Sequence, residues 1–187
     1  MQQDLIVSPR APSTLERILS DFTDILCGCV IAVAFLFLFL LRPVGVDGAS
    51  MEPTLYNQQH IVISAFARQL SYEDIVIISE AGTQMQPPRV IVKRVIGLPG
   101  DVIDIDFDNG IVLRNDIPLV EDFIAPVDFL RRGDVEFPVT VTPGAAFLLG
   151  DNRNNSLDSR HSAIGLVDQN YIIGQFWFAL PRLPGAR

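Results

Sequence analysis

The sequence has 187 residues and a formal net charge of −8, with 22 acidic residues against 14 lysines and arginines. This length accommodates one membrane anchor and one modest domain. The acidic balance leaves no basic tract of the kind that binds nucleic acid. Cys27 and Cys29 are only two residues apart in an apolar run, which excludes a disulfide framework.

The first element in chain order is an apolar run over residues 25–41, which carries no charge until Arg42. Its length is at the short end of the range of about 17 to 25 residues that spans a bilayer core. A cleaved signal peptide would have a shorter apolar core behind a basic start, whereas Asp21 and Asp24 precede this run. A buried core helix would have a polar face, which is absent here. We therefore expect a membrane anchor over residues 25–41.

The charges around the run give a weak indication of orientation. Arg10 and Arg17 precede it and Arg42 follows it, which favours a cytoplasmic N-terminus. We expect residues 1–24 to form a cytoplasmic segment and residues 42–187 to form an extracytoplasmic domain.

After the anchor, the pattern changes to short β-rich stretches bounded by Gly, Pro and Asn. Apolar and aspartate residues alternate over residues 103–108, and Asn109-Gly110 follows, which predicts a β-hairpin. The aspartates are typical of one solvated strand face, with a metal site as the alternative. The expected fold class is mainly β: one N-terminal transmembrane helix, then a single antiparallel β domain. Its strands are expected at residues 60–64, 74–79, 89–96, 102–107, 111–114, 135–140, 145–149 and 171–178.

The first of three chemical motifs is Gly48-Ala49-Ser50-Met51-Glu52-Pro53-Thr54-Leu55. Small residues before Ser50 let a substrate backbone approach, and Pro53 restricts the turn behind it. A serine hydroxyl is a weak nucleophile unless a base takes its proton. By itself this stretch is typical of an ordinary surface turn, so Ser50 becomes a candidate nucleophile only together with a base.

The second motif supplies that base, in Lys93-Arg94-Val95-Ile96-Gly97-Leu98-Pro99-Gly100-Asp101. Lys93 has apolar neighbours on both faces of a strand. Burial favours the neutral form of an amine, which can act as a general base. The alternative is a lysine whose ammonium reaches water along its aliphatic stem, as we expect for Arg94.

The third motif is Gly150-Asp151-Asn152-Arg153-Asn154-Asn155-Ser156-Leu157-Asp158-Ser159-Arg160. Its Asn, Asp and Ser content is typical of a tight turn held by side-chain to backbone hydrogen bonds. Counted as a calcium loop from Asp151, it has Arg153 at the third position and Ser162 at the twelfth, which does not suit calcium. We therefore expect it to support the site.

In this order, behind an apolar run, the three motifs resemble those of the type I signal peptidases, which are membrane-bound serine proteases with a Ser-Lys dyad. The resemblance implies that Ser50 is the acylated nucleophile and Lys93 its general base. It implies that the Ser156 hydroxyl hydrogen-bonds the Lys93 amine. It also implies a structural salt bridge between Asp158 and Arg160. Asp151 and Gly48 are further supporting positions.

The match covers most of residues 44–174 and departs from the family at Gly48, at Glu73 and after Arg160. After Arg160 the family often has an aromatic residue directly before a glycine, whereas here His161-Ser162-Ala163-Ile164 precedes Gly165. Gly48 stands where many members have a serine whose hydroxyl helps to hold the oxyanion, so that role would fall mainly to the backbone N–H of Ser50. Glu73, in Tyr72-Glu73-Asp74-Ile75-Val76, stands where the family usually has Gly. The stretch between Lys93 and Gly150 leaves little room for the large accessory β domain that some members carry.

The resemblance implies removal of N-terminal signal peptides from secreted preproteins at a bacterial cell (inner) membrane. The implied partners are preprotein signal peptides, the lipid bilayer and, transiently, the secretion machinery. No metal or organic cofactor is implied. A dedicated pilus-maturation or organellar inner-membrane peptidase would use the same dyad.

Two alternatives lie outside this family. A non-catalytic, membrane-anchored module that binds partners would need neither Ser50 nor Lys93. A histidine-dependent hydrolase would use His60 or His161. The aromatic stretch over residues 176–180 is expected either on the membrane surface or in the β core.

Overall fold

The computed structural model describes residues 13–35, 37, 41–64, 69–79 and 90–181. Arg10, Arg89 and positions 36 and 38–40 of the apolar run lie outside the described residues. The chain forms two compact units, Met1–Phe39 and Leu40–Arg187, which are described separately.

The helix of the first unit is α1 (Thr14–Phe35). The Ser13 N–H donates to Glu16 Oε2 at 2.6 Å and the Glu16 N–H donates to Ser13 Oγ at 3.3 Å, which is a reciprocal capping box. Because this cap sets the start, the helix begins well before residue 25, where we expect the anchor to begin. Its most apolar window has a mean hydropathy of 1.9, and by length and composition α1 can cross a membrane.

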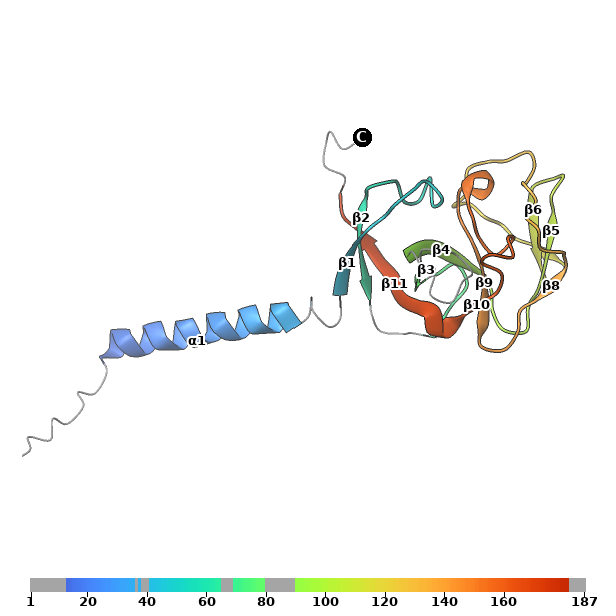
Figure 1. Cartoon of the computed structure of the whole chain (residues 1–187). Coiled ribbons are helices and arrows are strands. Elements are labelled where there is room, and N and C mark those ends of the chain that lie inside the picture. Colours follow the sequence, from blue (N-terminus) through green and yellow to red (C-terminus); the bar gives the residue numbers. More distant parts are fainter. Residues whose placement is uncertain (1–12, 36, 38–40, 65–68, 80–89, 182–187) are drawn as a thin grey trace, which may run out of the picture. The chain divides into compact units, whose positions relative to one another are not determined.

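The second unit consists of two antiparallel sheets, which confirms the expected mainly β fold. A seven-stranded sheet has the order β1-β2-β11-β3-β4-β9-β10, and a four-stranded sheet has the order β7-β6-β5-β8. Figure 1 shows the smaller sheet at the end of the domain beside β9. The strands are β1 (Leu41–Gly45), β2 (His60–Ser64), β3 (Ile75–Ser79), β4 (Val90–Gly97), β5 (Val102–Asp106), β6 (Ile111–Arg114), β7 (Ile117–Pro118), β8 (Val139–Thr140), β9 (Ala145–Leu149), β10 (Val167–Asp168) and β11 (Ile172–Ala179).

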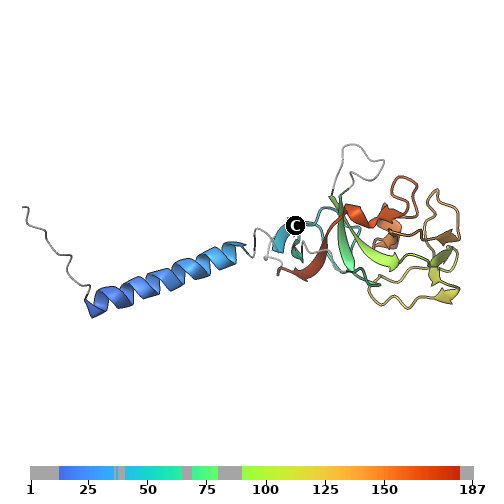
Figure 2. The same cartoon turned by 90° about the horizontal axis from the view of Figure 1, so that it is seen from below.

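Most expected strands are confirmed. β2, β6 and β9 have the expected bounds. β3 and β5 differ by one residue at one end, and β4 and β11 are shifted by one residue at both ends. The long β11 pairs with both β2 and β3 (Figure 2). The sequence does not predict β1, in which Leu41 pairs with Ser64. Leu41 therefore lies in the β domain, although the sequence places it at the end of the expected anchor. The strand was missed because an apolar residue at the end of an apolar run carries no local sign of strand pairing.

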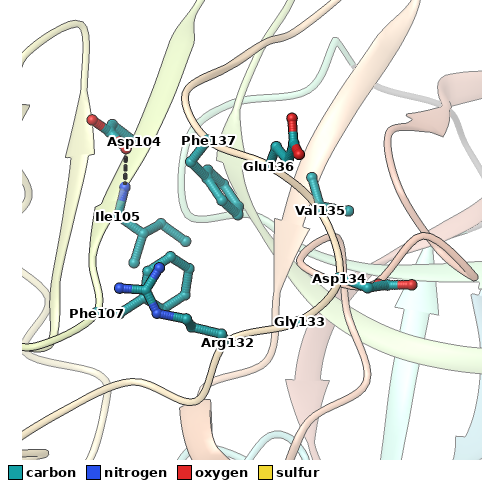
Figure 3. Close-up of a pocket in the computed structure, with 9 residues that line it drawn as sticks. All are labelled: Asp104, Ile105, Phe107, Arg132, Gly133, Asp134, Val135, Glu136 and Phe137. Atoms are coloured by element: carbon teal, nitrogen blue, oxygen red, sulfur yellow. Dashed lines mark hydrogen bonds between the residues drawn. The ribbon is translucent and has the colours of Figure 1, made fainter.

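The strand expected at residues 135–140 is wrong for its first part. Only β8 forms, where Val139 pairs with Ile103 and Thr140 pairs with Val102. The next residue towards the N-terminus is Pro138, which has no N–H to donate to the ladder. Between β5 and the loop over residues 132–137 the structure contains a cavity of about 560 Å³ (Figure 3).

Two aspartate side chains of β5 accept backbone N–H groups, one at this open edge and one in the hairpin. Asp104 Oδ1 accepts the Ile105 N–H at 2.8 Å (Figure 3). The hairpin is confirmed, but its loop is longer than Asn109-Gly110, because Asp106 pairs with Ile111. Asp106 Oδ1 accepts the N–H groups of Asp108 and Asn109, and hydrogen bonds from Asn109 hold the pKa of Asp106 below its ordinary value. These two aspartates therefore brace local backbone. In the described ranges, no three His, Cys, Asp or Glu side chains are grouped as metal ligands would be.

Three clusters of apolar side chains fill the domain and cover both faces of β4. Val92 lies in the cluster that contains Met51 and Leu55 of the first motif. Val95 lies in the cluster that contains Leu148 of β9. The third cluster packs the smaller sheet against β9, through residues including Ile96, Ile103, Phe107, Phe147 and Leu149. Lys93 is thus carried by a strand that is buried on both sides.

The C-terminal aromatic stretch lies only partly in the β core. Phe176 and Ala179 pack against the cluster around Met51, whereas Trp177 is 59% exposed. Trp177 and Phe178 form an edge-to-face pair with ring centroids 5.2 Å apart. The stretch is therefore partly core and partly surface.

We predict that Gly133→Ala destabilises the β domain. An added Cβ would lie 1.9 Å from the Arg160 carbonyl oxygen, so backbone must shift, and such overpacking costs about 1–3 kcal/mol or more. Denaturant unfolding of the full-length chain in detergent, followed by circular dichroism, measures this cost. Gly45→Ala is the matched control, because its Cβ would meet nothing within 4 Å. Equal stability of the two variants would contradict the prediction.

Candidate active site

The site is centred on the side chain of Lys93. In β4, Lys93 pairs with Val76 of β3, and the next residue, Arg94, pairs with Leu149 of β9. Lys93 is therefore in an interior strand of the sheet and is only 3% exposed. Its Nζ donates to Ser50 Oγ at 2.9 Å and to the Val92 carbonyl oxygen at 2.9 Å. The structure thus joins the predicted nucleophile to the predicted base.

Ser50 is held by the turn that follows β1. Met51 and Leu55 are buried, and the Leu55 N–H donates to the Met51 carbonyl at 2.9 Å. Gly48 has a φ of +88° and donates its N–H to Asn57 Oδ1 at 2.9 Å. A residue with a side chain would be strained at this φ, so the backbone favours the Gly that stands here in place of the family's serine.

Strand register brings the third motif to Lys93. Arg94 pairs with Leu149, so continuing the antiparallel register by one residue places Gly150 opposite Lys93. A Cβ on Gly150 would lie 2.2 Å from Ser156 Oγ and 2.5 Å from the Ser50 carbonyl oxygen. Only a glycine at position 150 therefore lets Ser156 Oγ and the Ser50 carbonyl oxygen lie this close to the backbone there. Within the described ranges, Ser156 Oγ is buried without a hydrogen-bond partner, and its bond to the Lys93 amine stays a prediction.

Arg94 differs from the expectation that it reaches water. It is 7% exposed, and its Nε donates to Asp151 Oδ1 at 2.8 Å while Nη2 donates to Oδ2. The Thr54 hydroxyl also donates to Asp151 Oδ2. Strand register explains this contact. Arg94 of β4 pairs with Leu149 at the end of β9, so Asp151 lies just beyond that end, beside Arg94. One carboxylate therefore ties the three motifs together, a role that the sequence pattern alone does not reveal.

The backbone at Glu73 is tied to the same network. Its carbonyl accepts Arg94 Nη1 at 2.9 Å and its N–H donates to the Val95 carbonyl at 2.8 Å. Glu73 has a φ of +68°, in the left-handed region that favours glycine. This accounts physically for the Gly that the resembling family usually has here.

Asp158 and Arg160 form a buried ion pair, with Arg160 Nε donating to Asp158 Oδ1 at 2.8 Å and Nη2 to Oδ2 at 2.8 Å. Burial by itself would raise the pKa of Asp158. The hydrogen bonds and the charge of Arg160 outweigh burial and hold that pKa below its ordinary value. Arg160 Nη2 also donates to the Arg153 carbonyl, so the pair braces the loop that carries Ser156.

A third ion pair was missed by sequence reasoning. The Arg153 guanidinium donates to both carboxylate oxygens of Glu121, and both side chains are buried. Arg153 Nε also donates to the Gly150 carbonyl at 3.1 Å. Glu121 lies in the loop after β7, where no local pattern indicates its partner, so only the tertiary structure identifies it.

The cavity between β5 and its neighbouring loop contains none of the motif residues in its lining. It is lined by Asp104, Ile105, Phe107, Arg132, Gly133, Asp134, Val135, Glu136 and Phe137 (Figure 3).

The histidines also make contacts that do not involve Ser50. His60 is exposed on β2, and His161 Nδ1 lies 3.9 Å from Asp134 Oδ1. Ser159, which precedes Arg160, accepts the Leu148 N–H at 2.9 Å and is buried. These contacts do not favour the histidine alternative.

We predict that Asp151→Asn strongly destabilises the β domain. It leaves the buried Arg94 guanidinium without its carboxylate, and breaking a buried pair costs about 3–5 kcal/mol. Denaturant unfolding of the full-length chain measures the loss. Asp122→Asn removes the same charge from an exposed position and serves as the control. The prediction fails if both variants unfold at the wild-type denaturant concentration.

Comparisons with known proteins identify the family of this chain. The family model described as "Signal peptidase, peptidase S26" matches residues 19–180. "Signal peptidase I P" of Bacillus subtilis subsp. natto is 32% identical over 92% of this chain and 97% of its own length. "Signal peptidase I" of Bacillus caldolyticus is 35% identical over 80% and 84% of the two chains. A crystal structure of a signal peptidase I from Enterococcus faecalis V583, 26% identical, aligns with a TM-score of 0.48 over 59% of this chain and 98% of that chain. The chain therefore belongs to the signal peptidase family, peptidase S26, and is a serine endopeptidase.

Proposed function

We propose that this chain is a membrane-anchored endopeptidase that removes N-terminal signal peptides from secreted preproteins through an acyl-enzyme. Ser50 is the nucleophile and Lys93 the general base. The observation that carries the proposal is the 2.9 Å separation of Lys93 Nζ and Ser50 Oγ, with the amine buried in an interior strand. Such a distance is within reach of direct proton transfer.

Burial explains how a lysine can do this work. An ammonium group loses its hydration when it is buried, so burial favours the neutral amine. Neutral Lys93 takes the Ser50 hydroxyl proton as Oγ attacks the scissile carbonyl. The resulting ammonium gives that proton to the leaving amine when the C–N bond breaks, which leaves an ester on Ser50. Water then loses a proton to Lys93, attacks the ester and releases the new carboxylate while Oγ regains a proton.

The developing oxyanion needs a donor, and Gly48 has no hydroxyl to supply one. The Ser50 N–H donates to no acceptor within the described part of the chain. It belongs to the residue that carries the attacking oxygen. In this account it is the main oxyanion donor. These steps use only side chains and backbone of this chain and need no metal or organic cofactor.

In this account the part of α1 from residue 25 onward anchors the enzyme in a bacterial cell membrane, with residues 1–24 on the cytoplasmic side and the β domain outside. The length and apolar composition of α1 and the family membership support the anchor. Arg10 and Arg17 precede the apolar run and only Arg42 directly follows it, which supports the orientation. A preprotein emerging from the secretion machinery would then meet the β domain beside the bilayer.

We predict that Ser50→Ala and Lys93→Ala abolish cleavage of a secretory preprotein by the purified full-length chain in detergent. Loss of either member of a nucleophile–base pair lowers kcat by at least about 10³-fold. Ser162→Ala is the matched control, because that exposed hydroxyl donates to Asp134 and makes no contact with the dyad. Cleavage products resolved by mass spectrometry locate the cut.

Two results would overturn the proposal. One is a folded Ser50→Ala or Lys93→Ala variant that still cuts the preprotein. The other is an inert wild type, which would favour the non-catalytic binding module. Cleavage restricted to one class of preprotein would instead favour the pilus-maturation or organellar type of peptidase.

A further inference from the structure

One residue of the third motif holds the backbone on both sides of Ser50. The Asn152 N–H donates to the Ser50 carbonyl oxygen at 2.9 Å. Its side-chain amide Nδ2 donates to the Ala49 carbonyl oxygen at 3.1 Å. The carbonyls before and after the nucleophile therefore have donors on the same residue.

The bond to Ala49 has a directional consequence. The Ala49 carbonyl and the Ser50 N–H belong to one peptide plane, and in a trans peptide these two groups point in opposite directions. Fixing the direction of the Ala49 carbonyl therefore fixes the direction of the Ser50 N–H. The Glu52 N–H also donates to this carbonyl, at 3.2 Å, so the plane is held from two sides.

The bond to the Ser50 carbonyl fixes the next peptide plane. With the planes on both sides held, the φ and ψ angles of Ser50 are set, and with them the direction of its Cα–Cβ bond. The position from which Oγ meets Lys93 Nζ thus depends on contacts made by Asn152. Displacement of a reacting group by about 1 Å can cost on the order of 10²-fold in rate.

We propose that Asn152 is a positioning residue, which aims the Ser50 N–H at the oxyanion and Ser50 Oγ at the scissile carbonyl. This inference rests on the proposed function, since it assigns the Ser50 N–H as the oxyanion donor. The assignment matters in this chain because Gly48 offers no second donor from its side chain. Asn152 acts through Ser50 and does not itself touch the substrate.

Asn154 provides a matched comparison in the same loop. It is half-buried like Asn152, and its side chain also makes two hydrogen bonds. Its Oδ1 accepts the Arg131 N–H at 2.8 Å and its Nδ2 donates to the Phe129 carbonyl at 3.0 Å. It therefore braces residues 129–131, and these two hydrogen bonds involve neither Ala49 nor Ser50.

The test compares Asn152→Ala, Asn152→Asp and Asn154→Ala in the full-length chain in detergent. Asn152→Asp keeps the shape of the side chain and loses the amide donor. The first readout is kcat and KM for preprotein cleavage. The second is affinity for a peptide boronate, which forms a tetrahedral adduct on the serine and places an oxygen where the oxyanion develops.

We expect both Asn152 variants to lower kcat by on the order of 10- to 100-fold, with KM within about twofold of wild type. Affinity for the boronate should fall in parallel with kcat. Asn154→Ala should keep both quantities within about twofold of wild type, because its hydrogen bonds lie away from the nucleophile. If Asn152→Ala does not fold, Asn152→Asp decides the question.

The inference is overturned if folded Asn152 variants keep wild-type kcat and boronate affinity, or if Asn154→Ala loses as much as they do. A lower melting temperature with unchanged kcat would assign Asn152 a purely structural role and would also overturn it. A wild-type chain that cuts no preprotein overturns the proposed function and this inference together. An active wild type with unaffected Asn152 variants overturns the inference alone.

Discussion

The amine of Lys93, buried against the hydroxyl of Ser50, is the constraint on which the rest of the site depends. A lysine on an interior strand with 3% of its surface exposed loses most of its hydration, which penalises the charged form. This penalty applies to one lysine, because Lys93 is the only lysine in the sequence. Keeping its Nζ 2.9 Å from Ser50 Oγ requires that the turn after β1, the strand β4 and the loop after β9 keep their positions relative to one another.

Three buried ion pairs provide this restraint in an acidic protein whose other cations are arginines. Each guanidinium binds a carboxylate and also donates to a backbone carbonyl. The side chain of Arg94 holds the Glu73 carbonyl, that of Arg153 holds the Gly150 carbonyl and that of Arg160 holds the Arg153 carbonyl. Because guanidinium groups have several fixed donors, one side chain can neutralise an acid and fix a loop together. The three ion pairs thus hold the loops around the Ser50–Lys93 dyad in place.

Local patterns predicted what depends on local sequence. Short β-rich stretches bounded by Gly, Pro and Asn located β2, β6 and β9, and the three motifs located the residues that meet at Lys93. The failures involve distant partners or single residues. Pro138 stops β8 because it lacks an N–H, and Leu41 joins β1 through pairing with β2. Neither Glu121 nor Asp151 carries a local sign of the arginine that it binds, since only strand register and the loop path bring them together.

The protonation state of Lys93 is the central claim and can be measured directly. With one lysine in the chain, selective carbon-13 labelling of lysine at Cε gives one side-chain signal in the full-length protein in detergent. Its chemical shift is followed by NMR as the pH is raised. The account predicts a midpoint well below the ordinary lysine value of about 10.4, because burial favours the neutral amine. A midpoint at or above that ordinary value would mean that Lys93 stays charged at working pH, and it would contradict its role as general base.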